Sequence, residues 1–92
     1  MKIGLKYFAR IAELTGKKEE EFTFENDIFL QDLISFLISK YGDEFKSYLF
    51  DENSNEIKSF FKFIINGKLS EYKNVKISDN SEIIIIPPVS GG

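Results

Sequence analysis

The sequence predicts an α+β fold in which one long helix crosses one face of a mixed sheet of four to five strands. Three observations lead to this prediction. Residues 30–41 carry apolar side chains at helical spacing, strand-like segments stand at both ends of the chain, and turn-forming residues separate the segments. Because a single helix covers only one side of a sheet, the other side is expected to lie open.

The N-terminal segment is expected to form two strands joined by a short helix. Over residues 2–8 apolar and polar side chains alternate, which predicts a strand with one buried face. A helix over about 9–15 should end at Gly16, since glycine adopts the left-handed conformation that terminates helices. Residues 18–24 form the second strand, and glutamates 19–21 are expected to be its solvated start. The side chains expected on the buried face of the first strand are Ile3, Leu5 and Tyr7.

The long helix is the most clearly defined element. Asn26-Asp27 is expected to supply its N-cap oxygens and Gly42 its C-cap. The pattern does not place Phe36, which falls outside the apolar stripe and could cover the flank of the helix. The apolar stripe consists of Leu30, Leu33, Ile34, Leu37, Ile38 and Tyr41.

The C-terminal half is expected to add strands. Asn66-Gly67 is a strong turn signal, and Asp79-Asn80-Ser81 is a second one. Pro87 and Pro88 must end the last strand, because neither can donate an N–H to a ladder. The expected elements are a helical turn or two over 43–50, a break at 51–55, a strand over 60–65, a short edge strand over 75–77 and a last strand over 82–86.

This order of elements is that of the β-grasp, or ubiquitin-like, arrangement. It places the first and last strands side by side in the centre, with the long helix in the crossover between them. The 92 residues correspond to one domain. We predict a β-grasp domain over residues 1–88 and a flexible C-terminal tail over residues 89–92.

Composition excludes several kinds of site. The chain has no Cys and no His, which excludes thiol nucleophiles, Cys/His zinc sites and His general bases. The net charge is −3 and the Lys and Arg residues are scattered, so no basic patch for nucleic acid is visible. No signal-peptide pattern follows Met1, and no apolar run approaches the ~18 residues of a membrane span. We expect a cytoplasmic protein that binds no metal, nucleic acid or membrane.

The last strand predicts an apolar surface. Ile83 to Ile86 are consecutive, and neighbouring side chains of a strand point to opposite faces. One pair therefore faces the core, and the other pair faces the uncovered side, where Tyr7 or Phe8 could join it. Exposed apolar patches often mark partner sites. The alternative, in which loops shield the second pair, stays open.

The tail predicts acyl chemistry. Pro87-Pro88 favours a stiff extended segment, and Val89 offers one apolar anchor. After Ser90, Gly91 and Gly92 have no side chains, so they can thread a narrow channel on another protein. Adenylation by ATP would turn the carboxylate of Gly92 into a mixed anhydride that a sulfur or nitrogen nucleophile attacks. The alternative is a frayed end, against which the double proline and the order of elements argue.

The chain resembles the MoaD/ThiS family of ubiquitin-like sulfur carriers. The resemblance covers nearly the whole chain, and the tail is similar to that of the MoaD group, the small subunits of molybdopterin synthase. Residues 43–62 are longer than in the shortest members, and Asn80 stands where a glycine is common. The matching segments are Lys6-Tyr7-Phe8-Ala9-Arg10, Glu13-Leu14-Thr15-Gly16, the two turns and Pro87-Pro88-Val89-Ser90-Gly91-Gly92.

This resemblance implies a non-catalytic carrier that binds no cofactor. A ubiquitin-activating-type adenylyltransferase would use ATP to activate Gly92, and a sulfurtransferase would supply the sulfur of its thiocarboxylate. Val89, Ser90, Gly91 and Gly92 would insert into the large subunit of molybdopterin synthase, in a heterotetramer. The residues implied at the partner interface are Phe8, Ile84, Ile86, Pro87 and Pro88.

Other functions remain open at the level of sequence. The same terminal chemistry serves sulfur carriers for thiamine, tRNA thiolation or cysteine synthesis. A ubiquitin-like protein modifier conjugated through Gly92 needs the same fold and tail. A binding module with an inert tail is the fourth alternative.

Overall fold

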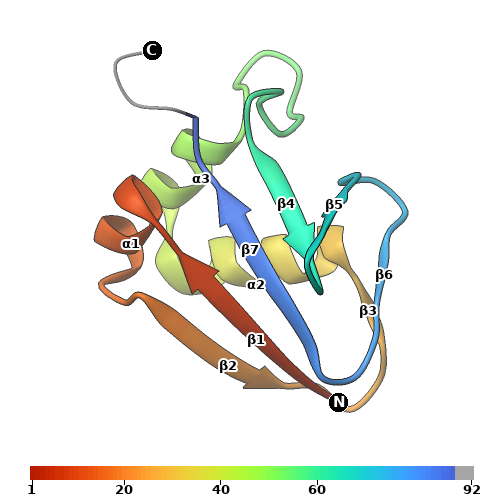
Figure 1. The fold of residues 1–92 in the computed structure, drawn as a ribbon. Coiled ribbons are helices and arrows are strands. Elements are labelled where there is room, and N and C mark those ends of the chain that lie inside the picture. The colour runs from red at the N-terminus through yellow and green to blue at the C-terminus, as the bar shows by residue number, and fades with distance from the viewer. Residues whose placement is uncertain (89–92) are drawn as a thin grey trace.

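Two strands from opposite ends of the chain lie side by side in the centre of the sheet (Figure 1). In this computed structural model, which describes residues 1–88, β1 (Lys2–Tyr7) and β7 (Ser81–Ile86) pair in parallel. Ile3 lies opposite Ser81, and Tyr7 lies opposite Ile85. The central pairing of first and last strand is therefore confirmed, and with it the β-grasp architecture.

In the described part of the chain, the main sheet has five strands in the order β2-β1-β7-β4-β5. β2 (Glu19–Thr23), β4 (Lys62–Ile65) and β5 (Lys68–Ser70) pair antiparallel with their neighbours. A separate two-stranded sheet joins β3 (Ile28–Phe29) to β6 (Lys76–Ile77). The edge strand expected over 75–77 thus exists as β6, but it pairs outside the main sheet. The sequence pattern does not predict β3 or β5, because strands of two or three residues are too short to show alternation.

Within the described residues, three helices follow the expected positions: α1 (Ala9–Thr15), α2 (Leu30–Tyr41) and α3 (Asp43–Leu49). α2 crosses the back of the sheet in the view of Figure 1. Gly16 ends α1 with a φ of 74°, as predicted. Within residues 1–88, no helix combines the length and the apolar character that crossing a bilayer requires.

The start of α2 differs from the expectation. Asn26-Asp27 does not cap the helix, because β3 intervenes between them. The N–H of Phe29 donates instead to the carboxylate of Asp32 at 3.3 Å, and the N–H of Leu30 donates to the carbonyl of Val75 at 2.7 Å. Pairing with β6 therefore fixes where the helix begins, and this long-range contact leaves no local signal in the sequence.

The core lies between the sheet and α2. Alternate side chains of β1, β7 and β4 point to the helix, and the apolar stripe of α2 meets them. Each fully buried side chain of this kind contributes about 1.5–3 kcal/mol to stability. A register slip of one residue would turn the whole set of a strand to the opposite face, and these contributions would be lost. The buried residues of the three strands are Ile3, Leu5, Tyr7, Ile83, Ile85 and Phe63; those of α2 are Leu30, Leu33, Ile34 and Leu37.

Phe36, which the helical pattern leaves outside the stripe, packs against β2 and the residue after it. Its ring meets those of Phe22 and Phe24 edge-to-face, at centroid distances of 5.0 and 5.3 Å. The side chain remains 39% exposed. Phe36 therefore lies on the flank of α2 that faces β2. Its ring, together with those of Phe22 and Phe24, forms an aromatic surface beside the sheet edge.

Glu20 corrects the expectation of a solvated strand start at residues 19–21. Its side chain is only 7% exposed, because alternation along β2 turns it toward the helices. Its carboxylate accepts hydrogen bonds from Tyr7 Oη and Tyr41 Oη, both at 2.7 Å, and from Lys17 Nζ at 2.9 Å. Burial raises the pKa of Glu20, but the hydrogen bonds and the charge of Lys17 outweigh it and hold the pKa below its ordinary value. Burial, followed by the neighbouring carboxylate, raises the pKa of Tyr7 and of Tyr41.

We expect Glu20→Gln to lower the free energy of unfolding by about 2 kcal/mol at pH 7, because two tyrosine hydroxyls and Lys17 lose a charged acceptor. The pKa of Glu20 is lowered by folding, so its contribution is complete above the unfolded-state pKa and is lost as pH falls through the folded-state value. The difference between wild type and Glu20→Gln, measured by urea unfolding, should therefore shrink between pH 5 and pH 3. Glu19→Gln, at an exposed neighbouring position, is the control and should show little change at either pH. An equal deficit of Glu20→Gln at both pH values would contradict this account.

Candidate functional site

The sheet face that points away from α2, here called the far face, carries a strip of apolar side chains. Ile84 of β7 lies opposite Ile64 of β4, which in turn lies opposite Leu69 of β5. The strip therefore crosses three neighbouring strands. Leu69 is 73% exposed. In the part of the chain shown as ribbon in Figure 1, no helix lies over β7 and β4 on this side.

Two further apolar side chains extend the strip toward the end of β7. Ile86 follows Ile84 on the same face. Phe8, 48% exposed, comes directly after β1, and the parallel pairing of Tyr7 with Ile85 brings it alongside Ile86. We call these five side chains the docking surface: Phe8, Ile64, Leu69, Ile84 and Ile86. Tyr7 does not contribute, since it is buried in the core.

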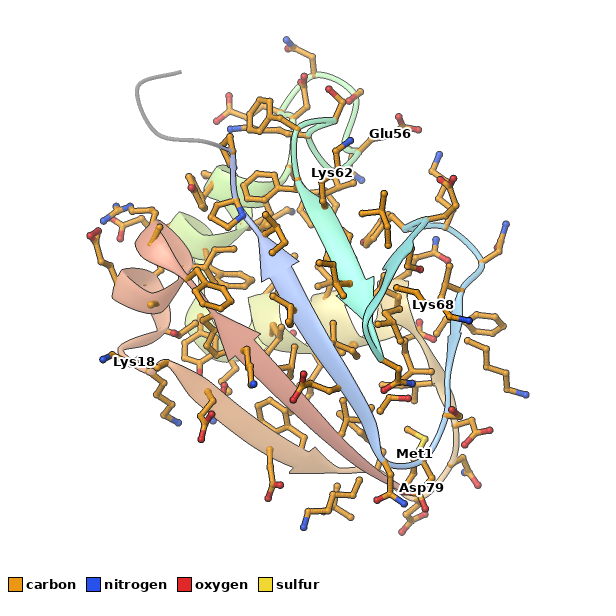
Figure 2. The ribbon with its side chains drawn as sticks, viewed as in Figure 1. Met1, Lys18, Glu56, Lys62, Lys68 and Asp79 are labelled. Carbon is orange, nitrogen blue, oxygen red and sulfur yellow. The ribbon has the colours of Figure 1, made fainter. Side chains whose placement is uncertain are left out.

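The junction to the tail lies at one end of the docking surface. Pro87 and Pro88 continue from β7 and are half-buried. The interface residues predicted from sequence are therefore neighbours at this end of the sheet, and Lys62, which pairs with Ile86, is placed beside them (Figure 2). Val89, Ser90, Gly91 and Gly92 lie outside the described residues, and their role as the inserted and reactive tail stays a prediction.

Sequence reasoning missed Ile64 and Leu69. The available signal was the Asn66-Gly67 turn, because a two-residue hairpin loop fixes which residues of its strands pair. With Ile65 opposite Lys68, Ile64 must lie opposite Leu69. Phe63 marks the buried face of β4, so Ile64 and its partner belong to the far face.

Asn66 holds this hairpin against the start of β7. Asn66 and Gly67 both have positive φ, 52° and 83°, as the tight turn between β4 and β5 requires. The N–H of Glu82 donates to Asn66 Oδ1 at 2.9 Å, and the N–H of Asn66 donates to the Glu82 carbonyl at 2.9 Å. Asn66 Nδ2 also lies 3.3 Å from Ser81 Oγ. These contacts align β5 with β7 and so position Leu69.

Charged pairs border the apolar strip on the β1 side. Lys6 Nζ lies 3.4 Å from Glu82, and Lys2 Nζ lies 3.6 Å from Glu21. All four side chains are exposed, so these pairs contribute little to stability. They give the surface a polar border of both signs around an apolar centre, the usual composition of a protein–protein interface.

The groups with the most strongly shifted pKa lie away from the far face. Residues 1–88 contain no group of acidic side chains arranged to hold a metal ion, and the sequence supplies no Cys or His. The tyrosines whose pKa is most strongly raised, Tyr7 and Tyr41, belong to the Glu20 cluster on the other side of the sheet. Among the described residues, the far face therefore presents an apolar strip with charged pairs on its β1 side.

Comparison with known proteins agrees with this geometry. The sequence matches the ThiS family over residues 5–92. The fold is similar to that of SAMP1 from Haloferax volcanii, with a TM-score of 0.85 at 23% identity and complete coverage of both chains. The small archaeal modifier protein 1 (SAMP1) from Methanosarcina acetivorans is 27% identical, with a TM-score of 0.80 over 99% of this chain and 96% of that one.

A third similar structure comes from Pyrococcus furiosus. It is provisionally assigned as molybdopterin converting factor, subunit 1. It is 27% identical, with a TM-score of 0.76 over 97% of this chain and 99% of that one. No curated protein matches the sequence.

We expect Asn66→Ala to lower the free energy of unfolding by about 2 kcal/mol, because alanine loses the side-chain bonds to β7 and tolerates the positive φ poorly. Asn66→Gly is the matched control. It loses the same bonds but not the backbone conformation, so about half of that cost should remain. Urea unfolding of the three proteins measures both values. Equal stability of wild type and Asn66→Ala would show that the turn does not hold the hairpin.

Proposed function

The chain belongs to the ThiS family of small sulfur carriers and ubiquitin-like modifiers, and from this premise we propose that Gly92 carries sulfur as a C-terminal thiocarboxylate. The observation that supports the proposal is the continuity of the docking surface with the tail. Ile84 and Ile86 lie on the same strand that leads into Pro87 and Pro88. A partner that binds the far face would therefore lie beside Pro87 and Pro88, after which the tail begins.

The first step of the proposed cycle is activation. An oxygen of the Gly92 carboxylate attacks the α-phosphorus of ATP, pyrophosphate leaves, and an acyl adenylate forms. A sulfur nucleophile at the sulfide level then attacks the carbonyl carbon and AMP leaves, which yields the thiocarboxylate. A ubiquitin-activating-type adenylyltransferase supplies the catalytic groups and binds the ATP, and a sulfurtransferase delivers the sulfur. The chain contributes the acyl group and the surface by which it is held.

The proposed destination of the sulfur is molybdopterin. Val89 to Gly92 would enter the large subunit of molybdopterin synthase, in a heterotetramer, and the sulfur would pass to a pterin precursor. Two observations support this choice: the similarity to the Pyrococcus furiosus protein and the MoaD-like sequence Pro87-Pro88-Val89-Ser90-Gly91-Gly92. Thiamine, tRNA thiolation and cysteine synthesis are other products that the same thiocarboxylate could serve.

Protein modification is the second candidate function. The specific observation in its favour is the 27% identity to the small archaeal modifier protein 1 of Methanosarcina acetivorans over 99% of this chain. The activated Gly92 would then be attacked by a lysine amine of a target protein instead of by sulfur. The two functions share the docking and activation steps and differ in the final nucleophile.

The terminal chemistry can be tested by intact mass spectrometry. We expect the chain incubated with an activating enzyme, ATP and a sulfur donor to gain the mass that corresponds to exchange of one oxygen for sulfur. Deletion of Gly91-Gly92 should abolish the gain without changing the circular dichroism spectrum. If neither a sulfur-containing species nor a conjugate of higher mass forms, both candidate functions are ruled out.

Reconstitution separates the destinations of the sulfur. The thiocarboxylate form, mixed with the large subunit of molybdopterin synthase and the pterin precursor, should give molybdopterin, while the carboxylate form should not. Conjugates of higher mass that depend on Gly92, together with an inactive reconstitution, would assign the chain as a modifier.

We expect Leu69→Ser to raise the KM of the activating enzyme for this carrier about tenfold, because a side chain of that size loses its burial in the interface. Leu69 is 73% exposed in the free chain, so the melting temperature should hardly change. Phe29→Ser, on β3 and 44% exposed, is the control and should leave the KM near the wild-type value. An unchanged KM for Leu69→Ser would remove the far face from the activation step.

A further inference from the structure

β2 is an edge strand whose outer side lies open within the described part of the chain. Among residues 1–88, the main sheet ends at β2, whose only strand neighbour is β1 (Figure 1). β2 spans 5 residues, a length of about 17 Å. An open edge of this length can accept a further strand, since its backbone groups are already aligned.

The pairing with β1 determines which backbone groups face outward. The N–H of Tyr7 donates to the carbonyl of Lys18, and the N–H of Phe24 donates to the carbonyl of Met1. Residues of an antiparallel pair alternate between bonded and non-bonded positions, so the even-numbered residues of β2 bond inward. The N–H and C=O groups of Glu19, Glu21 and Thr23 therefore point away from the sheet.

The two faces of this edge differ in chemistry. The residues whose backbone points outward place their side chains on the far face, opposite Lys6, Gly4 and Lys2. Of these, Glu19 makes no ion pair with any described residue, and Glu21 makes only the exposed contact with Lys2 at 3.6 Å. An added strand would thus have carboxylates beside every second side chain on that face.

An aromatic shelf borders the same edge on the helix side. Phe22 and Phe24 lie under the ring of Phe36, whose side chain is 39% exposed. Lys40 Nζ lies 5.7 Å from the centre of the Phe22 ring, so the shelf has one cationic corner. The intervening side chains of an added strand would lie against these rings, where apolar groups are favoured.

From these features we infer that the β2 edge binds an extended segment of a partner protein in which lysine or arginine alternates with apolar residues. The segment adds a strand to the sheet through the outward backbone groups of Glu19, Glu21 and Thr23. Its basic side chains lie beside Glu19 and Glu21, and its apolar side chains rest on the aromatic shelf. Main-chain hydrogen bonds supply affinity, and the alternation supplies specificity.

A second copy of this chain fits the edge poorly. β2 against β2 would set glutamates beside glutamates, which is destabilising. The opposite edge, β5, also fits poorly when it adds antiparallel to β2, the orientation that keeps the far faces of both copies on the same side. Lys68, which pairs with Ile65, belongs to the helix-side face and Leu69 to the far face, so an antiparallel β5 would put the apolar side chain beside the carboxylates.

The test uses backbone amide NMR of the full chain. The probe is a capped peptide as long as β2, with alternating lysine and valine, and the matched control replaces each lysine by glutamate. We expect saturable shifts of residues 19–24 and of the shelf residues Phe36 and Lys40 with the lysine peptide only. The far-face variant Leu69→Ser should bind it unchanged, which separates this site from the one proposed for activation. The inference would be overturned if the lysine peptide caused no saturable shifts, or if the glutamate peptide bound equally well.

Two variants test the binding mode. Glu21→Pro removes one outward N–H and none of the inward bonds, so it should abolish peptide binding while the chain stays folded. The double variant Glu19→Gln with Glu21→Gln should weaken binding about fivefold, while the exposed Glu71→Gln should not. Full binding to a folded Glu21→Pro chain would overturn strand addition. A dimer of the wild-type chain that Glu21→Pro abolishes would assign the edge to a second copy and overturn the proposed partner.

Discussion

The parallel pairing of β1 with β7 is the constraint on which the rest of the structure depends. Parallel neighbours cannot be joined by a tight turn, so the chain between them must cross over one face of the sheet. α2 lies in that crossover, and the core forms between it and the sheet. The other face is left without a helix among residues 1–88, which is why Leu69 is exposed there and Ile64, Ile84 and Ile86 are only half-buried. The same pairing brings the end of β1, with Phe8, alongside the end of β7.

The two sides of β2 show how one strand serves stability and recognition. Glu20 points inward, where two tyrosines and Lys17 satisfy its carboxylate and join β1, β2 and α2. Its neighbours Glu19 and Glu21 point to the far face and keep their charge in water. A buried carboxylate without these partners would cost several kcal/mol, so the network is a condition for the acidic strand to form part of the sheet. The docking surface extends over β7, β4 and β5 to Phe8, whereas the proposed strand addition uses the outer edge of β2.

Several features could be predicted from the sequence because they depend on local periodicity. The alternation in residues 2–8 and the stripe of α2 each specify a buried face without reference to the rest of the chain. The same reasoning predicted that one pair of the four consecutive isoleucines faces away from the core, whereas the family resemblance implied Phe8, Ile84 and Ile86 at the partner interface. It failed for Asn26-Asp27, because a strand pairing rather than a cap decides where α2 begins. It failed for Glu20 because a run of three glutamates resembles a solvated segment until a strand turns one of them inward.

The sequence by itself determined which side chains share a face and what chemistry is available: no thiol or imidazole anywhere, and glycines after a double proline. Only the tertiary structure decided which faces meet. Ile64 and Leu69 join Ile84 because β4 lies beside β7 and β5 lies beside β4, and Glu20 accepts a hydrogen bond from Tyr41 across 21 positions of sequence. The physical reason is that periodicity is a property of neighbouring residues, whereas strand order, register and the partners of a buried charge are set by contacts between distant ones.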